Sequence, residues 1–261
     1  MRKFEGLLRI GAAALLVASV GACGISTSET VPAISPSATA TKARKPKPSP
    51  SQVAVVPDRW SAPTTGKTIY LTFDDGPSLQ SPEILDVLKE NHIQATFFVI
   101  GAMIPTRKPI LQRMFQDGHA VGNHTWRHED LTKLSTAKIK DNLTETARTI
   151  GRRMGPCMRP PYGGVNARVR KASKAVGMTP IMWNIDTTDW NHAPVALITA
   201  RLLGAHGGSV VLMHDGGGDG AATATALRAA LPVLKAKGYK FAAVPLCLPL
   251  SSNGTSQPPR S

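Results

Sequence analysis

The chain has 261 residues, of which 42% are hydrophobic, and its lysines and arginines outnumber its aspartates and glutamates by 31 to 17. This composition excludes a wholly disordered chain and leaves room for one large α/β domain. The formal net charge of +14 suits polyanionic surroundings or a solvated basic surface, but no nucleic-acid-recognition motif accompanies it, so we expect no nucleic-acid partner.

The N-terminus predicts export from the cytoplasm. Positive charges within the first nine residues precede a short apolar stretch, Ile10–Val20, which is too short for a permanent membrane span. Residues 1–23 therefore have the pattern of a signal peptide. The sequence Val20-Gly21-Ala22-Cys23 resembles the lipobox of bacterial lipoproteins, in which the cysteine, here Cys23, becomes lipid-modified. We expect a domain anchored at the outer face of the bacterial cytoplasmic membrane or, if the leader is a plain secretory signal, a secreted one.

Three regions follow the leader. Residues 24–65 are rich in Ser, Thr, Pro, Ala and Lys and lack a hydrophobic period, which predicts an extended, disordered linker. Residues 66–250 form the predicted catalytic domain. Residues 251–261 return to Ser, Asn, Gly and Pro and are expected to form a loose tail.

Strand-like and helix-like segments alternate through the predicted domain. The expected strands are Lys67–Phe73, Ala95–Ile100, Ala120–Asn123, Cys157–Arg159, Thr179–Asn184, Ser209–His214 and Phe241–Val244. The expected helices are Pro82–Asn91, Pro109–Gln116, Thr136–Met154, Ala167–Val176, Pro194–Gly204 and Ala222–Lys235. About seven such alternations predict a parallel sheet closed into a (β/α) barrel. An open doubly wound sheet would produce the same order of elements, but a barrel better explains polar clusters at so many strand ends.

Five short polar clusters each follow an apolar, strand-like run. Because parallel strands bring their carboxyl ends to one face, the clusters predict a single site. That site would combine carboxylates, imidazoles and an arginine, as in a metal-dependent hydrolase. The clusters are Thr72–Pro77, His124–His128, Arg159–Gly163, Asp186–Trp190 and Leu212–Asp215.

The first two clusters supply a candidate metal site. Asp74 and Asp75 end a strand where Gly76 and Pro77 break the extended geometry, so both carboxylates can enter one site; a turn with a helix-capping aspartate is the alternative. His124 and His128 are four residues apart, which places both rings on one face of a helical turn. Imidazole favours zinc, cobalt or nickel. A site with two histidines and one aspartate would leave positions for water and substrate.

The other clusters supply candidate proton-transfer and binding groups. Arg159 either orients a catalytic aspartate or forms an ion pair that only closes the barrel end. A carboxylate from Asp189 would fix the tautomer of His214 and favour its protonated form, which makes His214 a candidate general acid. Trp190 offers a flat apolar surface that suits a sugar ring, although a tryptophan is more commonly part of the core.

Two cysteines, Cys157 and Cys247, stand in apolar, strand-like segments. An oxidising compartment permits a disulfide between them, but free buried cysteines are also common in such segments. The choice depends on their Cα separation, which the sequence does not provide.

Together the five clusters resemble the motifs of the polysaccharide deacetylase family, carbohydrate esterase family 4, whose domain is also called the NodB-homology domain. All five occur in order between Thr72 and Asp215, and the resemblance covers roughly Lys67 to Leu250. It implies a distorted (β/α) barrel of about seven strands. It also implies removal of N- or O-acetyl groups from polymers such as peptidoglycan, chitin or xylan.

The resemblance implies a role for each residue of the first three motifs. Asp74 would be the general base, and Arg159 would orient it. Asp75, His124 and His128 would ligate a divalent metal, with zinc expected first and cobalt or nickel as alternatives.

Further roles are implied for the remaining motif residues. His214 would be the general acid, and Asp189 would tether it. The backbone amide of Tyr162 would help to hold the oxyanion. Trp190 and Leu212 would wall the acetyl pocket.

The expected protein is therefore a monomeric, metal-dependent deacetylase whose partner is an acetylated cell-wall polysaccharide, most directly peptidoglycan or a chitin-like polymer. A glycosidase also uses two carboxylates but needs no paired histidines. A non-catalytic wall-binding lipoprotein on the same fold is the alternative, and it predicts loss of Asp74 or His214. Both residues are present.

Overall fold

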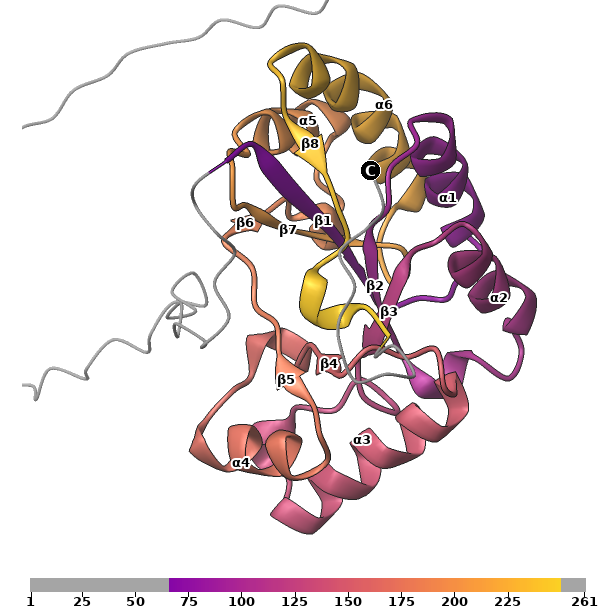
Figure 1. Ribbon diagram of the computed structural model, residues 1–261, viewed down its shortest axis with the longest axis vertical. Helices are drawn as coiled ribbons and strands as arrows, with labels where there is room; N and C mark the ends of the chain where they lie inside the picture. The colour runs from indigo at the N-terminus through magenta and orange to yellow at the C-terminus, as the bar shows by residue number, and fades with distance from the viewer. Residues whose placement is uncertain (1–65, 250–261) are drawn as a thin grey trace, which may run out of the picture. The chain divides into compact units, whose positions relative to one another are not determined.

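The computed structural model describes residues 66–249 (Figure 1). The predicted leader with Cys23, the linker and the tail lie outside the described residues. None of the helices in residues 66–249 combines the length and the hydrophobicity that crossing a bilayer requires.

Seven strands form one parallel sheet in the order β5-β4-β3-β2-β1-β7-β6, and an eighth strand, β8, pairs with the start of β1. The pairs found in the described residues do not join β5 to β6, so the barrel is incomplete on that side. This confirms the predicted distorted (β/α) barrel. The strands are β1 (Thr68–Asp74), β2 (Thr96–Val99), β3 (Ala120–Asn123), β4 (Cys157–Met158), β5 (Thr179–Pro180), β6 (Ile185–Asp186), β7 (Val210–His214) and β8 (Lys240–Phe241).

Helices flank the strands on three sides of the view in Figure 1, with α1 contacting α2 and α6, α3 contacting α4, and α5 contacting α6. Apolar side chains of β1 are buried on both faces of the sheet, as expected for a central parallel strand. Fully buried Phe73 of β1 stacks on Phe97 of β2 with ring centroids 5.0 Å apart. The helices are α1 (Ser81–Glu90), α2 (Lys108–Gln116), α3 (Thr136–Ile150), α4 (Ala167–Ala175), α5 (Val195–Leu203) and α6 (Gly220–Ala236).

Three predicted elements differ from the structure by more than two residues at one end. The predicted strand Phe241–Val244 shares only Phe241 with β8. Helix α3 ends at Ile150, four residues before the predicted end, because Gly151 adopts a positive φ of 89° that stops the helix. The predicted strand Thr179–Asn184 is wrong. Its first residues form β5 beside β4, whereas the backbone N–H of Asn184 already donates to Val210 of β7. Pro180 lacks the N–H that a longer central strand would need, and the chain crosses the open side of the barrel after it.

A disulfide joins Cys157 at the start of β4 to Cys247 in a 3₁₀ helix, Pro245–Cys247, with the two Cα atoms 5.1 Å apart. The structure therefore settles the pairing that the sequence left open. Gly155 lies against this turn so closely that a Cβ atom there would be 1.9 Å from the carbonyl oxygen of Cys247. The chain consequently has no room for a side chain at that position.

Candidate active site

The strand register brings the predicted clusters together. Asp74 at the end of β1 lies beside His214 at the end of β7. On the other side of β1, β3 leads into His124 and the neighbouring β4 leads into Arg159. The carboxyl ends of four strands thus supply the four groups, as strand-end placement predicts.

Arg159 and Asp74 form a buried ion pair. The Nη1 atom of Arg159 donates to Asp74 Oδ1 at 2.8 Å and to the hydroxyl of Thr72 at 2.7 Å. Its guanidinium carbon lies 4.3 Å from the ring centroid of Phe98 and 5.5 Å from that of Trp183. Burial lowers the pKa of Arg159, and the charge of Asp74 opposes that shift. Because removal of one partner would leave an unpaired buried charge, the pair is held firmly in place.

Asp75 and two histidines converge beside this ion pair. Asp75 has a left-handed backbone conformation with φ 71°. Its Oδ1 atom lies 3.3 Å from Nε2 of His124 and 3.3 Å from Nε2 of His128. On the outer side of the rings, His124 Nδ1 lies 2.8 Å from the carbonyl oxygen of Arg159, and His128 Nδ1 lies 3.1 Å from the hydroxyl of Tyr162. Since a carbonyl only accepts, His124 Nδ1 must carry the proton, and its Nε2 then presents a lone pair when the ring is neutral.

These three side chains fit a divalent metal. Their ligand atoms lie within 4.8 Å of one another, and Asp75 Oδ1 is buried without a hydrogen-bond partner among the described residues. A tetrahedral ion with bonds of about 2.1 Å would hold its ligand atoms about 3.4 Å apart. This is close to the 3.3 Å that separates Asp75 Oδ1 from Nε2 of His124 and from Nε2 of His128. Burial lowers the pKa of His124, but the charges of Asp74 and Asp75 raise it by more, so the site attracts positive charge.

On the β7 side, Asp189 holds His214. Asp189 Oδ1 accepts a hydrogen bond of 2.8 Å from His214 Nδ1, and its Oδ2 accepts from the backbone N–H of His214 at 2.8 Å. Thr187, Trp190 and Thr223 donate three further bonds to the same carboxylate. Burial lowers the pKa of His214, but the hydrogen bond and the charge of Asp189 raise it to about 9. At neutral pH His214 is therefore protonated and suited to act as an acid.

The predicted helical turn between the two histidines is wrong. His124–His128 is a loop after β3, in which Thr125 and His128 have positive φ values of 70° and 60°. The two left-handed residues turn both rings toward Asp75, with ring centroids 5.0 Å apart. The spacing of four was thus a correct signal of proximity, although a loop rather than a helix produces it.

The predicted binding residues take different positions. Tyr162 is 68% exposed and has a positive φ of 59°, which brings its ring against His128. The contact of its hydroxyl with His128 was missed, since the sequence suggested a role only for its backbone amide. Trp190 is 49% exposed beside Asp189. Leu212 is buried on β7, two residues before His214 and therefore on the same face of the strand.

Asp215 is a functional candidate to which sequence reasoning assigned no role. It is fully buried, its Oδ2 accepts from the Ser81 hydroxyl at 2.5 Å, and its backbone N–H donates to the backbone carbonyl of Asp74 at 3.0 Å. Burial raises its pKa to about 7. A Cβ atom on Gly76 would lie 2.0 Å from Asp215 Oδ2, so the carboxyl group supports the turn that follows Asp75. Its position directly after His214, at the end of a predicted strand, could have indicated in the sequence that it lies near the site.

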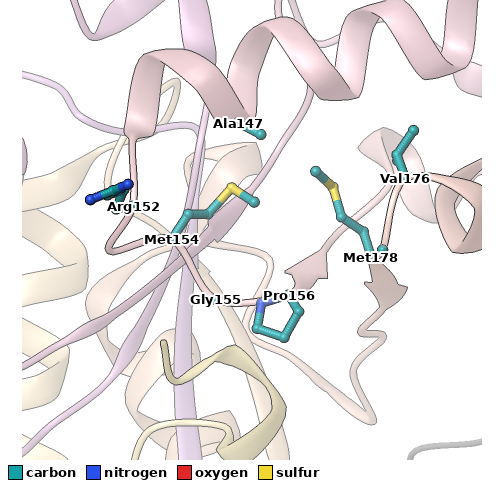
Figure 2. A pocket seen from close by; sticks show the side chains of 8 residues that line it. Ala147, Arg152, Met154, Gly155, Pro156, Val176 and Met178 are labelled. Carbon is teal, nitrogen blue, oxygen red and sulfur yellow. The ribbon is translucent and has the colours of Figure 1, made fainter. Parts of the chain in front are cut away.

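The part of the domain that the structure describes includes two hollows. One, of about 550 Å³, lies beside the metal triad and is lined by His128, Glu129, Asp130, Lys133, Leu134 and Tyr162. The other, of about 270 Å³, lies where the chain enters β4 and β5, at the opposite ends of the strands (Figure 2). Its lining contains Arg152 but no carboxylate or imidazole, so it lacks the groups that hydrolysis needs.

Comparison with known proteins identifies the family. Residues 61–181 match the family model described as polysaccharide deacetylase. The chain is 39% identical over 185 residues to a peptidoglycan-N-acetylglucosamine deacetylase of Listeria monocytogenes, covering 69% of this chain but only 38% of that protein. It is 33% identical over 196 residues to a chitooligosaccharide deacetylase of a Bradyrhizobium species, covering 69% of this chain and 90% of that one.

A solved structure agrees with the sequence matches. The crystal structure of a peptidoglycan N-acetylglucosamine deacetylase superposes with a TM-score of 0.70 at 32% identity, covering 76% of this chain and 94% of the other. The shared fold therefore extends over nearly all of that relative. The chain belongs to the polysaccharide deacetylase family, carbohydrate esterase family 4.

Proposed function

We propose that this protein is a metal-dependent hydrolase that removes acetyl groups from an N-acetylated or O-acetylated polysaccharide, either peptidoglycan or a chitin-like polymer. The observation that carries the proposal is the triad of Asp75, His124 and His128 beside two separately held proton carriers, Asp74 and His214. The named activities of the relatives, on peptidoglycan and on chitooligosaccharides, support the same substrate class.

The metal would be held by Asp75 Oδ1 and by the Nε2 atoms of His124 and His128. When bound, a divalent cation supplies Lewis-acid activation of an acyl carbonyl and of water. Zinc is proposed first because two imidazoles and one carboxylate are a common zinc ligand set, but cobalt and nickel accept the same ligands.

We propose that Asp74 acts as the general base. Arg159 holds its Oδ1, while its Oδ2 lies 3.8 Å from Nε2 of His124, at the edge of the metal triad. This oxygen is therefore within reach of a water molecule that attacks an acetyl carbonyl beside the triad. As the new C–O bond forms, the water proton would pass to Asp74.

We propose that His214 acts as the general acid. Its Nδ1 proton is engaged by Asp189, so Nε2 carries the proton available to a leaving group. When the C–N bond of an acetamido group breaks, this proton would go to the departing amine, and water supplies the oxygen of the released acetate. The backbone amide of Tyr162 would stabilise the tetrahedral oxyanion, a contribution of about 3–4 kcal/mol for a well-placed donor.

The place of action is proposed from the leader alone. Cys23 would carry a lipid that anchors the protein at the outer face of the cytoplasmic membrane, next to the cell wall, or the leader would be cleaved and the protein secreted. In both cases the acetylated polymer lies outside the cytoplasm. We propose that the protein works there as a monomer.

Acetate release tests this function. The purified protein would be incubated with peptidoglycan, chitin oligomers or acetylated xylan, with a chelator and then with zinc or cobalt restored. We expect release that the chelator abolishes and the metal restores. Tight metal binding without release from any of the three polymers would instead support a non-catalytic wall-binding protein.

A further inference from the structure

The end of the barrel opposite the candidate site has an uneven distribution of charge. All strand pairs are parallel, so the turns that lead into the strands lie together at that end. From residue 146 to residue 185 the chain contains no aspartate or glutamate. Five exposed basic residues lie where α3 and α4 end and lead into β4 and β5, and we call them the basic face: Arg148, Arg152, Arg153, Lys171 and Lys174.

The carboxylates of the described residues leave most of this charge unneutralised. None of the ion pairs found in residues 66–249 includes a member of the basic face. Arg153 instead stacks on Phe115, with its guanidinium carbon 4.2 Å from the ring centroid. In the neighbouring turns, Glu90 and Asp117 are each paired with basic side chains outside the face. Glu145, on an earlier turn of α3, offsets at most one of the five charges.

Helix stabilisation explains only part of the basic face. A basic residue in the last turn of a helix interacts favourably with the helix dipole, and Arg148 and Lys174 occupy such positions. Arg152 and Arg153 follow Gly151, where α3 has already ended, so they lie outside both helices. An anionic partner at this end of the barrel would account for their positions as well.

The hollow of about 270 Å³ lies within the basic face. Its lining is apolar apart from Arg152 and the backbone, and Figure 2 shows the side chains of Met154 and Met178 on either side of it. An apolar recess bordered by cations matches the boundary between the headgroups and the acyl chains of a lipid layer. A soluble polyanion would neutralise the cations but would leave the apolar lining uncovered. The recess therefore favours a lipid surface as the partner.

The predicted linker joins the domain at this same end. It covers residues 24–65, and β1 begins shortly after it, at Thr68. The start of β1 is held against the turn that leads into β7. A Cβ atom on Gly207 would lie 1.8 Å from the carbonyl oxygen of Gly66, and the backbone N–H of Gly208 donates to Thr68 at 2.8 Å. A chain anchored through Cys23 would thus be tied to the end of the barrel that carries the basic face.

We infer that the basic face docks on an anionic phospholipid surface, so that the candidate site opens away from the membrane. The inference rests on the proposed place of action but not on the deacetylase reaction. Each basic residue close to an anionic lipid surface raises the affinity for that surface about fivefold. This attraction extends over a Debye length, about 8 Å at physiological ionic strength, so it requires the face itself to approach the lipid.

Lysine labelling on vesicles tests the orientation in the full-length protein. The protein would be mixed with vesicles of phosphatidylcholine, with or without about 30% phosphatidylglycerol, and treated with an amine-reactive ester that does not cross membranes. Mass spectrometry then gives a labelling rate for each lysine. We expect Lys171 and Lys174 to react about 5- to 10-fold more slowly on the anionic vesicles, and high salt to abolish this protection. Lys138, exposed at the opposite end of α3, should react equally on both.

A pair of double variants tests whether the charge of the face causes the docking. Arg148→Gln with Arg152→Gln removes two of its charges and should weaken docking about 25-fold, so that Lys171 and Lys174 lose their protection. Lys138→Gln with Lys140→Gln is the matched control, because it removes two exposed charges from the first half of α3. The control should keep the protection of the parent protein.

Equal labelling of Lys171 and Lys174 on the two kinds of vesicle would overturn the inference. Protection that survives in the double variant of the basic face would overturn it as well. Protection by soluble polyphosphate, with none on the anionic vesicles, would assign the face to an anionic polymer instead of the membrane. Failure of the proposed function looks different, since acetate release would be absent while the labelling pattern stayed as expected.

Discussion

Asp75 and Asp189 are both carboxylates that contact imidazoles in the same site, yet their surroundings differ. Asp189 accepts hydrogen bonds from the ring and backbone of His214 and from Thr187, Trp190 and Thr223. Asp75 Oδ1 has no hydrogen-bond partner among the described residues and is equally distant from two imidazole nitrogens. The surrounding donors thus indicate the use of each carboxylate. One surrounded by N–H and O–H groups stabilises a protonated imidazole, and one that faces lone pairs binds a cation.

The contrast between Asp75 and Asp189 depends most strongly on Asp75 being a metal ligand. Asp75→Asn should lower metal affinity and reduce kcat/KM by about 10³-fold or more, because metal activation contributes several kcal/mol. Asparagine is chosen because it tolerates the left-handed backbone at this position better than alanine does. Zinc content by atomic absorption and acetate release would be measured together.

Asp141→Asn, on the exposed surface of α3, is the matched control for loss of one carboxylate and should retain zinc and activity. A fully active, zinc-replete Asp75 variant would show that the triad does not bind the catalytic metal.

His214→Ala removes the acid and leaves the triad intact. We expect kcat to fall by about 10²- to 10⁴-fold, the usual contribution of a positioned proton donor, with zinc still bound. Single-turnover acetate release and zinc content would separate the two effects. Loss of zinc in this variant would contradict the division between a metal carboxylate and a proton-holding carboxylate.

The convergence of these residues followed from the sequence, because strand ends of a parallel sheet meet at one face and each motif residue lies at such an end. Asp74, Asp75, Arg159 and His214 were placed correctly on that ground. The separate roles of the residues were implied by the family resemblance. The backbone conformation from His124 to His128 was predicted wrongly, because residues with a left-handed backbone, such as Thr125, produce no periodic pattern in the sequence.

Other features depended on distances that a linear pattern does not contain. The disulfide between Cys157 and Cys247 required a Cα separation across 90 residues. The contact of the Tyr162 hydroxyl with His128 joins residues 34 apart and depends on a positive φ at a non-glycine residue. The predicted strand Thr179–Asn184 is split because its first residues pair with β4, whereas Asn184 pairs with β7 on the other side of the incomplete barrel.

The pH dependence of the reaction sharpens the comparison on the Asp189 side. In the protein without metal the pKa of His214 is raised to about 9. The positive charge of a bound cation would lower this pKa, so kcat/KM should fall as pH rises along an alkaline limb that lies no higher than about pH 9. Asp189→Asn removes the negative charge and should move this alkaline limb toward lower pH. The same raised pKa stabilises the fold below the ordinary histidine value, and that contribution is lost as pH rises through about 9.

The measurement is kcat/KM for acetate release at saturating zinc, in the parent protein and in the variant. It would be taken between about pH 6 and pH 10, in steps of about 0.5 pH unit. Asp219→Asn, at the exposed start of α6, is the control because asparagine preserves its helix cap. An alkaline limb that stays in place in Asp189→Asn would show that another group sets it.

The smallest effect is expected from the outer contacts of His124 and His128, the two histidines proposed as metal ligands, because these contacts differ in kind. A backbone carbonyl fixes His124, whereas the hydroxyl of an exposed side chain, Tyr162, contacts His128. Tyr162→Phe keeps the ring edge-on to His128 but removes that hydroxyl, so zinc affinity should fall about 10-fold, at the low end for outer-shell partners. Competition with a chromogenic chelator would measure it, and added zinc should recover the loss. Unchanged affinity would mean that the surrounding loop, with His128 at its positive φ, orients the ring without the phenol.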